Sequence, residues 1–195
     1  MPSSMVHLLA AYKYDPKAST PFLIGSIVPD IIKGWEEKDR NHLRDREDRL
    51  GALCELAHTM DLQDDFQKGI LIHLFIDYMW DINPREEFTK RYEGYTWFKP
   101  YRHELSLVGS WLYHHTDWSK KVWEELMSYP LEQIENNEYD KYEIKDFLAR
   151  NYKWHDENYI GPSLFFTPEL VEKFTNEAVN EFRDWLDKIV KIVNR

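Results

Sequence analysis

The sequence predicts an all-α protein, a single compact multi-helix domain over residues 1–195 with a cluster of histidines and aspartates in its interior. Apolar residues recur at helical spacing, whereas seven glycines and few alternating β-branched runs give strands little support. A chain of 195 residues fits one domain, since cores tend to split only beyond roughly 250 residues. Hydrophobic residues make up 43% of the chain and aromatic residues 15%, which is ample apolar surface for one core.

Capping and proline signals divide the chain into helices. A serine can cap a first helix over residues 3–14, and a Thr-Pro pair opens a second over residues 20–28, which ends where a proline disfavours the helical state of the residue before it. Further helices are expected over residues 45–60, 64–81, 101–115, 117–128 and 131–150, with residues 31–45 as a polar connection and residues 151–166 as an aromatic-rich loop.

The last helix has the clearest pattern. Thr167-Pro168 has the form of a helix start, and apolar residues follow at steps of three and four positions. Such a stripe is typical of a helix that packs on the core. Its members are Leu170, Phe174, Ala178, Phe182, Trp185, Ile189 and Ile192.

Charge and composition limit the partners. The formal net charge is −10 with acids and bases interspersed, so the chain as a whole repels nucleic acid. The longest apolar run, residues 69–80, is too short to span a bilayer. The first residues lack the features of a secretory signal, and the only cysteine, Cys54, indicates a reducing compartment. We therefore expect a cytoplasmic protein with a small substrate, and the sequence leaves its oligomeric state open.

The run over residues 69–80 is the most informative stretch, because it contains His73 and Asp77. Four positions apart on a helix, the two side chains share a face, yet this helix is apolar all round, so both must be buried. A buried carboxylate needs compensation from hydrogen bonds, an imidazolium or a cation. On these residues alone, two interpretations remain open: the His73–Asp77 pair only joins helices, or it binds a metal ion.

Three further polar residues stand in apolar context. His7 interrupts an apolar stretch, Asp30 follows a buried segment, and His42 lies at the exit of the polar connection. Each alone is more often a satisfied core histidine or a helix-terminal carboxylate than a ligand. Together with His73 and Asp77 they form a set of three imidazoles and two carboxylates, which suits zinc and comparable divalent ions.

This succession of residues resembles the bacterial zinc-dependent phospholipase C family. The resemblance covers residues 5–80 and implies a helical phospholipase C/nuclease-like fold. It also implies a second ion between His7 and Asp77, with Asp77 bridging the two. The segments that carry it are His7, Phe22-Leu-Ile-Gly-Ser-Ile-Val-Pro-Asp30, Asn41-His42 and Gly69-Ile-Leu-Ile-His73-Leu-Phe-Ile-Asp77. The implied ligands of the first zinc ion are Asp30, His42, His73 and Asp77.

The chain departs from that family in two respects. Family members are exported and use an amino-terminal tryptophan as a ligand, whereas this chain begins with Met-Pro and shows no export signal. The family also places further histidines and a carboxylate soon after the His-x-x-x-Asp helix, and here the later candidates are His103, His114, His115 and Asp117. Apolar neighbours turn the end of the helix that carries His114 and His115 inward, so we expect one of these two to complete the cluster. His103 and His155 are interpreted as surface histidines.

The cluster and the resemblance together predict a metal-dependent hydrolase. Two divalent ions a few ångströms apart can activate water and stabilise charge on a phosphoryl group, so we expect a zinc-dependent hydrolase of a small phosphoester, with manganese or another divalent ion as alternatives. The resemblance implies that Asp30 is catalytic, orienting or deprotonating the attacking water. Arg44 is interpreted as a solvated arginine more readily than as a phosphate ligand.

Two other classes of protein were weighed. A non-catalytic helical protein with a structural metal site, or with an interaction role, is the main alternative. Helical phosphohydrolases of the histidine–aspartate type, whose members carry an adjacent His-Asp dipeptide, are set aside.

Overall fold

The computed structural model describes residues 2–134 and 139–193. Within these two ranges the regular structure is entirely helical, with no strand, which confirms the predicted all-α class and a single compact domain. None of the described helices combines the length and apolar character needed to cross a membrane. The elements are α1 (Ser4–Tyr14), α2 (Thr20–Gly25), the 3-10 turn η1 (Val28–Ile31), α3 (Trp35–Asn41), α4 (Arg49–Thr59), α5 (Asp65–Ile82), α6 (Pro84–Thr89), α7 (Phe98–His115), α8 (Ser119–Ser128), the 3-10 turn η2 (Leu131–Gln133), α9 (Lys141–Glu157) and α10 (Pro168–Val193).

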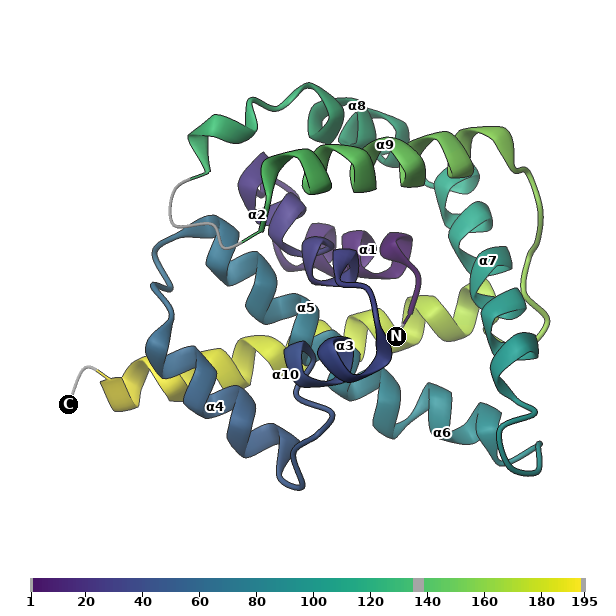
Figure 1. The fold of residues 1–195 in the computed structure, drawn as a ribbon, viewed down its shortest axis with the longest axis horizontal. Helices are drawn as coiled ribbons and strands as arrows, with labels where there is room; N and C mark the ends of the chain where they lie inside the picture. Colours follow the sequence, from purple (N-terminus) through teal and green to yellow (C-terminus); the bar gives the residue numbers. More distant parts are fainter. Residues whose placement is uncertain (1, 135–138, 194–195) are drawn as a thin grey trace.

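Helix α5 lies at the centre of the fold, with α1, α2, α4, α6 and α10 packed against it (Figure 1). Asp64 caps its N-terminus, because the Asp64 carboxylate accepts hydrogen bonds from two backbone N–H groups of the first turn. Two glycines allow α2 to touch it backbone to backbone: a Cβ on Gly25 would lie 2.2 Å from the Phe66 carbonyl oxygen, and one on Gly69 equally close to that of Phe22. This contact brings the turn after α2, and with it η1, against the polar residues of α5.

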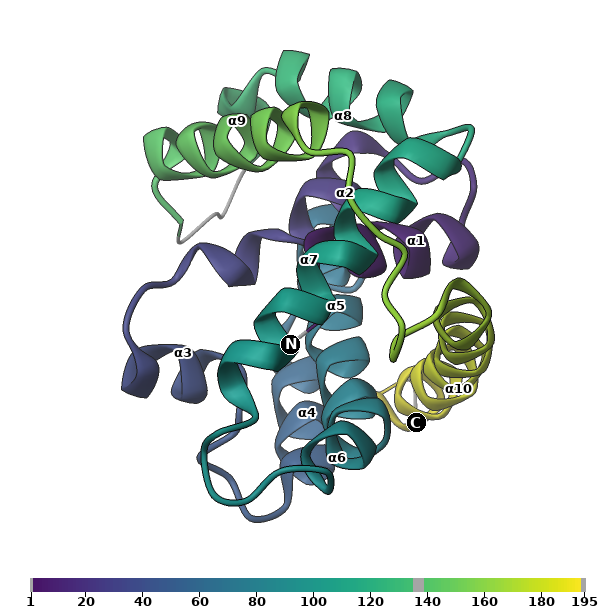
Figure 2. The ribbon, with the colours of Figure 1, turned by 90° about the vertical axis from the view of Figure 1, so that its right-hand side faces the viewer.

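The other helices close the core around α5. Helix α1 is buried along most of its length and packs on α10 and α7, while α8 and α9 lie together on one side of the molecule (Figures 1 and 2). The described side chains of the predicted α10 stripe are buried or half-buried, as expected for a core-packing helix. Ile192, the last member of the stripe, lies outside the described side chains.

The predicted boundaries were wrong in three places. The connection over residues 31–45 contains α3, and α6 was not expected. Helix α9 starts only at residue 141, capped by Asp140, and runs to Glu157 instead of ending at 150. The helix continues because its inward-facing side chains continue from Asn151 to His155. The aromatic composition of this segment hid that helical spacing in the sequence. Residues 135–138 of the helix expected over 131–150 lie outside the described residues.

Candidate metal centre

Five of the seven predicted ligands come together in the interior. His7 comes from α1, Asp30 from η1, His42 from the end of α3, and His73 and Asp77 from α5. The three histidines and Asp77 are at most 1% exposed, whereas the Asp30 side chain is 11% exposed and forms the edge of the cluster nearest to solvent.

Asp77 lies in the middle of the group. Its Oδ1 is 3.3 Å from His7 Nε2, and its Oδ2 is 3.6 Å from His42 Nε2 and 3.9 Å from His73 Nε2. Asp30 Oδ1 lies 3.7 Å from His42 Nε2. Two sets of side chains each offer three ligand atoms within 4.8 Å of one another, His42–His73–Asp77 and His7–Asp30–His73. His73 therefore belongs to both sets, and Asp30 groups with His7 more closely than the family resemblance implied.

The backbone holds two histidines with their Nε2 atoms facing each other. His73 Nδ1 lies 2.8 Å from the Ser26 carbonyl oxygen, and His42 Nδ1 lies 2.8 Å from that of Lys38. A carbonyl only accepts, so each Nδ1 carries a hydrogen, and Nε2 is the ring atom left to bind a metal ion or share a proton. These two Nε2 atoms are 3.3 Å apart. Such an arrangement is repulsive unless a proton or a metal ion lies between them, and a carbonyl on the far nitrogen is the usual support of a metal-bound histidine.

His7 is the second sign that a cation is needed. Its Nδ1 has no hydrogen-bond partner and its Nε2 makes only the 3.3 Å ion-pair contact with Asp77 Oδ1, although the side chain is buried and its ring stacks on that of His73 at 3.9 Å. Apart from that contact Asp77 Oδ1 is buried without a hydrogen bond, whereas Asp30 Oδ1 forms an ion pair with Lys38 Nζ at 3.0 Å. Each unsatisfied buried polar group costs about 1–3 kcal/mol. A divalent ion among imidazole nitrogens and carboxylate oxygens would satisfy these atoms together, so the residues present fit a metal.

The local charges keep the ligands in the forms that bind metal. Burial by itself raises the pKa of Asp30, but Lys38, whose Nζ lies 3.0 Å away, holds that pKa below its ordinary range. Burial also acts to raise the pKa of Asp77, and positive charges that include Arg44 hold it well below the usual value. Burial lowers the pKa of His73 well below that of a free imidazole. Two anionic carboxylates and a neutral imidazole are the protonation states a metal requires.

An arginine–aspartate network supports Asp77 from outside the cluster. Arg44 donates to Asp77 Oδ2 at 3.0 Å and to Asp81 at 2.7 Å, and Arg49 and Arg85 also bind Asp81, at 2.8 and 3.0 Å. The Arg44 side chain is only 15% exposed, so its interpretation as a solvated arginine was wrong. Asp81 was missed, although its place one turn after Asp77 on α5 could have indicated it.

The structure does not bring His114 and His115 to the cluster. His114 Nε2 lies 3.0 Å from the His155 carbonyl oxygen, and His115 is exposed, stacked on Trp111 at 3.4 Å. Among the described residues, neither belongs to a group that could hold a metal. The end of α7 is indeed turned inward, but it meets the end of α9 and not α5 (Figure 2).

One adjacent histidine–aspartate pair does occur, His155-Asp156, so the class that carries such a pair was set aside without cause. His155 is buried, contrary to its interpretation as a surface residue, and its Nδ1 donates to the Asn151 carbonyl oxygen at 2.7 Å. Asp156 accepts a hydrogen bond from the Tyr113 hydroxyl at 3.3 Å. In the described part of the chain this pair joins no metal-binding group, which weighs against that class.

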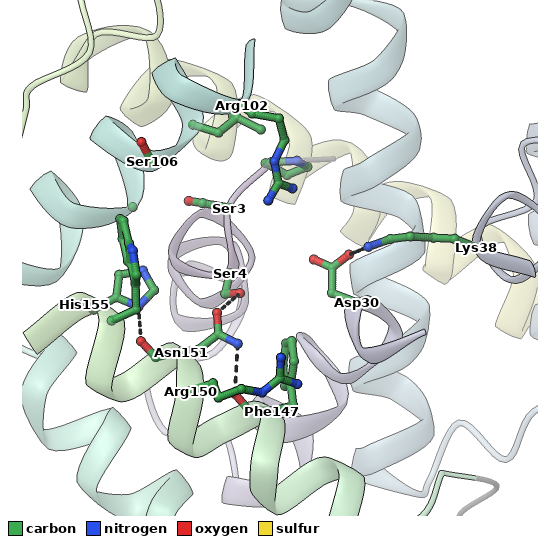
Figure 3. A pocket seen from close by; sticks show the side chains of 14 residues that line it. Ser3, Ser4, Asp30, Lys38, Arg102, Ser106, Phe147, Arg150, Asn151 and His155 are labelled. Carbon is green, nitrogen blue, oxygen red and sulfur yellow. Dashed lines mark hydrogen bonds and ion pairs between the residues drawn. The ribbon is translucent and has the colours of Figure 1, made fainter. Parts of the chain in front are cut away.

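A pocket of about 500 Å³ adjoins the cluster, and Asp30 is part of its wall (Figure 3). Side chains from the start of α1, η1, α3, α7 and α9 line it. Its polar and charged lining includes Ser3, Asp30, Lys38, Arg102, Arg150 and His155.

Fold and site together define an all-helical protein with a buried histidine–aspartate cluster at the edge of a pocket. Comparison of the chain with protein-family models, curated proteins and solved structures finds no match.

Proposed function

We propose that the cluster binds a divalent metal, zinc in the first place, and that the protein uses it to hydrolyse a small phosphoester. The observation that carries this proposal is the 3.3 Å separation of the His42 and His73 Nε2 atoms, while a backbone carbonyl holds Nδ1 of each ring. The proposed ligands are His7, Asp30, His42, His73 and Asp77. The resemblance to the zinc-dependent phospholipase C family supports the same assignment.

A divalent ion bound here would lower the pKa of a coordinated water and stabilise negative charge on a phosphoryl oxygen. Asp30 is the proposed catalytic residue, because it is the one carboxylate of the cluster that also lines the pocket. It would accept a proton from the attacking water. The water oxygen then bonds to phosphorus, the bond between phosphorus and the ester oxygen breaks, and the departing alcohol takes up a proton. The single cysteine suits a reducing compartment, so the proposed place of action is the cytoplasm.

The second candidate is a structural site without catalysis. It is favoured by Arg44, which donates to Asp77 Oδ2 and so occupies one oxygen of the central carboxylate. The contact of Arg44 does not satisfy His7 Nδ1, however, which is buried without a partner, and a purely structural site does not require the pocket that Asp30 lines. We therefore place catalysis first.

The test begins with elemental analysis of protein purified without added metal, and with an anomalous diffraction map after a zinc soak. Turnover of phosphomonoesters and phosphodiesters is then measured with zinc, manganese and magnesium. Asp77→Asn should abolish both zinc binding and turnover, whereas Asp146→Asn, a matched change at an exposed carboxylate on α9, should leave both intact. Absence of metal near the five side chains after the soak refutes the proposal. If fully metallated protein turns over none of these esters, the structural site without catalysis is the remaining candidate.

A further inference from the structure

The pocket beside Asp30 carries positive charge on two sides. Arg102 reaches it from α7 and Arg150 from α9, on opposite sides of the pocket in Figure 3. Among the described residues, no carboxylate forms an ion pair with either guanidinium; Arg150 Nε donates only to the backbone oxygen of Asp146. In a protein with a net charge of −10, two such arginines on one pocket indicate an anionic ligand.

Ser3 and His155 lie on the side of the pocket away from Asp30 (Figure 3), and the space that they border beside Gly109 is called the recess. A Cβ built on Gly109 would lie 3.1 Å from His155 Nε2 and 3.4 Å from Ser3 Oγ, so these two polar atoms border the same space. His155 donates through Nδ1 to the Asn151 carbonyl, which leaves its Nε2 as an acceptor. Burial lowers the pKa of His155 to about 4, so the ring is neutral near pH 7. Ser3 Oγ is buried without a hydrogen-bond partner.

We propose that the substrate is a hydroxylated phosphoester of the polyol or sugar phosphate class, and that one of its hydroxyl groups occupies this recess. That hydroxyl donates to His155 Nε2 and accepts a hydrogen bond from the Ser3 hydroxyl, so a single ligand group satisfies both atoms. The phosphate then lies towards Arg102 and Arg150, on the side of Asp30. This inference rests on the proposed function, because it names the substrate class of the same site.

The polar lining favours this class over an apolar alcohol. A lipid-like or alkyl group in the recess would leave His155 Nε2 and Ser3 Oγ without partners, and sites built to bind a hydroxyl discriminate strongly against analogues that lack it. The volume of about 500 Å³ suits a small molecule. An aromatic alcohol would fit better in a neighbouring groove of about 370 Å³, which Trp35, Trp97 and Phe98 line.

The test compares three phosphomonoesters: glycerol 3-phosphate, propyl phosphate, which has a three-carbon chain without free hydroxyls, and phenyl phosphate. Dissociation constants are measured by calorimetry on chelator-treated protein, where turnover cannot interfere, and kcat/KM is measured with zinc. Wild-type protein should prefer glycerol 3-phosphate over propyl phosphate by about tenfold in both measurements. The preference should fall towards one in Ser3→Ala, which removes no hydrogen bond of the protein, and in Gly109→Ala, which fills the recess. Ser106→Ala is the matched control, because that serine lines the pocket but already donates to the His103 carbonyl oxygen.

Each outcome decides one of the two proposals. Equal affinity for glycerol 3-phosphate and propyl phosphate in the wild type overturns the hydroxyl site, and so does a preference that survives Ser3→Ala and Gly109→Ala. Tighter binding of phenyl phosphate, unaffected by Gly109→Ala, overturns it in favour of the aromatic groove. Discrimination in binding without turnover of any ester refutes the proposed hydrolysis and leaves the ligand class standing. Turnover of the esters without a preference for glycerol 3-phosphate over propyl phosphate refutes the hydroxyl site and leaves the proposed hydrolysis standing.

Discussion

The contact between α2 and α5 should control both stability and metal binding, and Gly69→Ala tests it. The new Cβ would lie 2.2 Å from the Phe22 carbonyl oxygen, which is backbone and cannot rotate away. An ordinary contact needs at least 3.4 Å, so α2 must move away from α5 by about 1 Å. That movement carries Ser26, whose carbonyl oxygen accepts the hydrogen bond from His73 Nδ1 at 2.8 Å.

The expected loss of stability follows from two opposing effects. Overpacking a close backbone contact costs about 3 kcal/mol at the upper end of the usual range. Replacing a helical glycine by alanine returns about 1 kcal/mol through helix propensity. We therefore expect Gly69→Ala to lower the free energy of unfolding by about 2 kcal/mol, measured by urea denaturation in chelator. Zinc affinity, measured by competition with a chelating dye, should fall about tenfold or more because His73 loses its fixed orientation.

Gly109→Ala is the matched control, since it makes the same substitution in a helix. The nearest heavy atom to its Cβ is 3.1 Å away and belongs to a side chain, so the neighbour need shift by only a few tenths of an ångström. It should change stability by less than about 1 kcal/mol and leave zinc affinity unchanged. A Gly69→Ala protein with wild-type stability and zinc affinity would refute the claim that this contact positions the centre.

Three further outcomes follow from the site. His7→Phe should reduce the rise in Tm that zinc causes, because it removes a ligand. It should cost metal-free protein no more than about 2 kcal/mol, because the 3.3 Å contact with Asp77 Oδ1 is the polar contact it loses; a larger loss contradicts this. The pKa of His155 is lowered by burial to about 4 in the folded state, so the unfolded chain takes up the proton first and stability falls by about 3 kcal/mol from pH 7 to pH 4. Urea denaturation in chelator should show this slope in the wild type and a flatter one in His155→Gln, and equal slopes would count against it. Chelation of metallated protein should lower Tm by about 5–10 °C in scanning calorimetry, if free metal exceeds its Kd about a hundredfold beforehand; an unchanged Tm would rule out coupling between metal and fold.

Local patterns in the sequence determined the helical class and the core of the cluster. The stripe over α10 and the apolar surroundings of His73 and Asp77 are properties of neighbouring residues, because helical periodicity shows which face of a helix is apolar. The same reasoning showed that His7 points inward, since it interrupts a run that is otherwise apolar. Burial of a polar residue in such a run can be inferred without knowing what it meets.

Only the tertiary structure decided which buried groups meet. His114 lies on an inward face, as expected, but that face packs on α9, and the bonds of Arg44 with Asp77 and Asp81 join residues more than 30 positions apart. The recess between Ser3, Gly109 and His155 joins α1, α7 and α9 and leaves no periodic signal in any of them. The physical reason is that periodicity is a one-dimensional property of each helix, whereas the partner of a buried face depends on how all the helices pack together and on backbone contacts as close as that of Gly25 with Gly69.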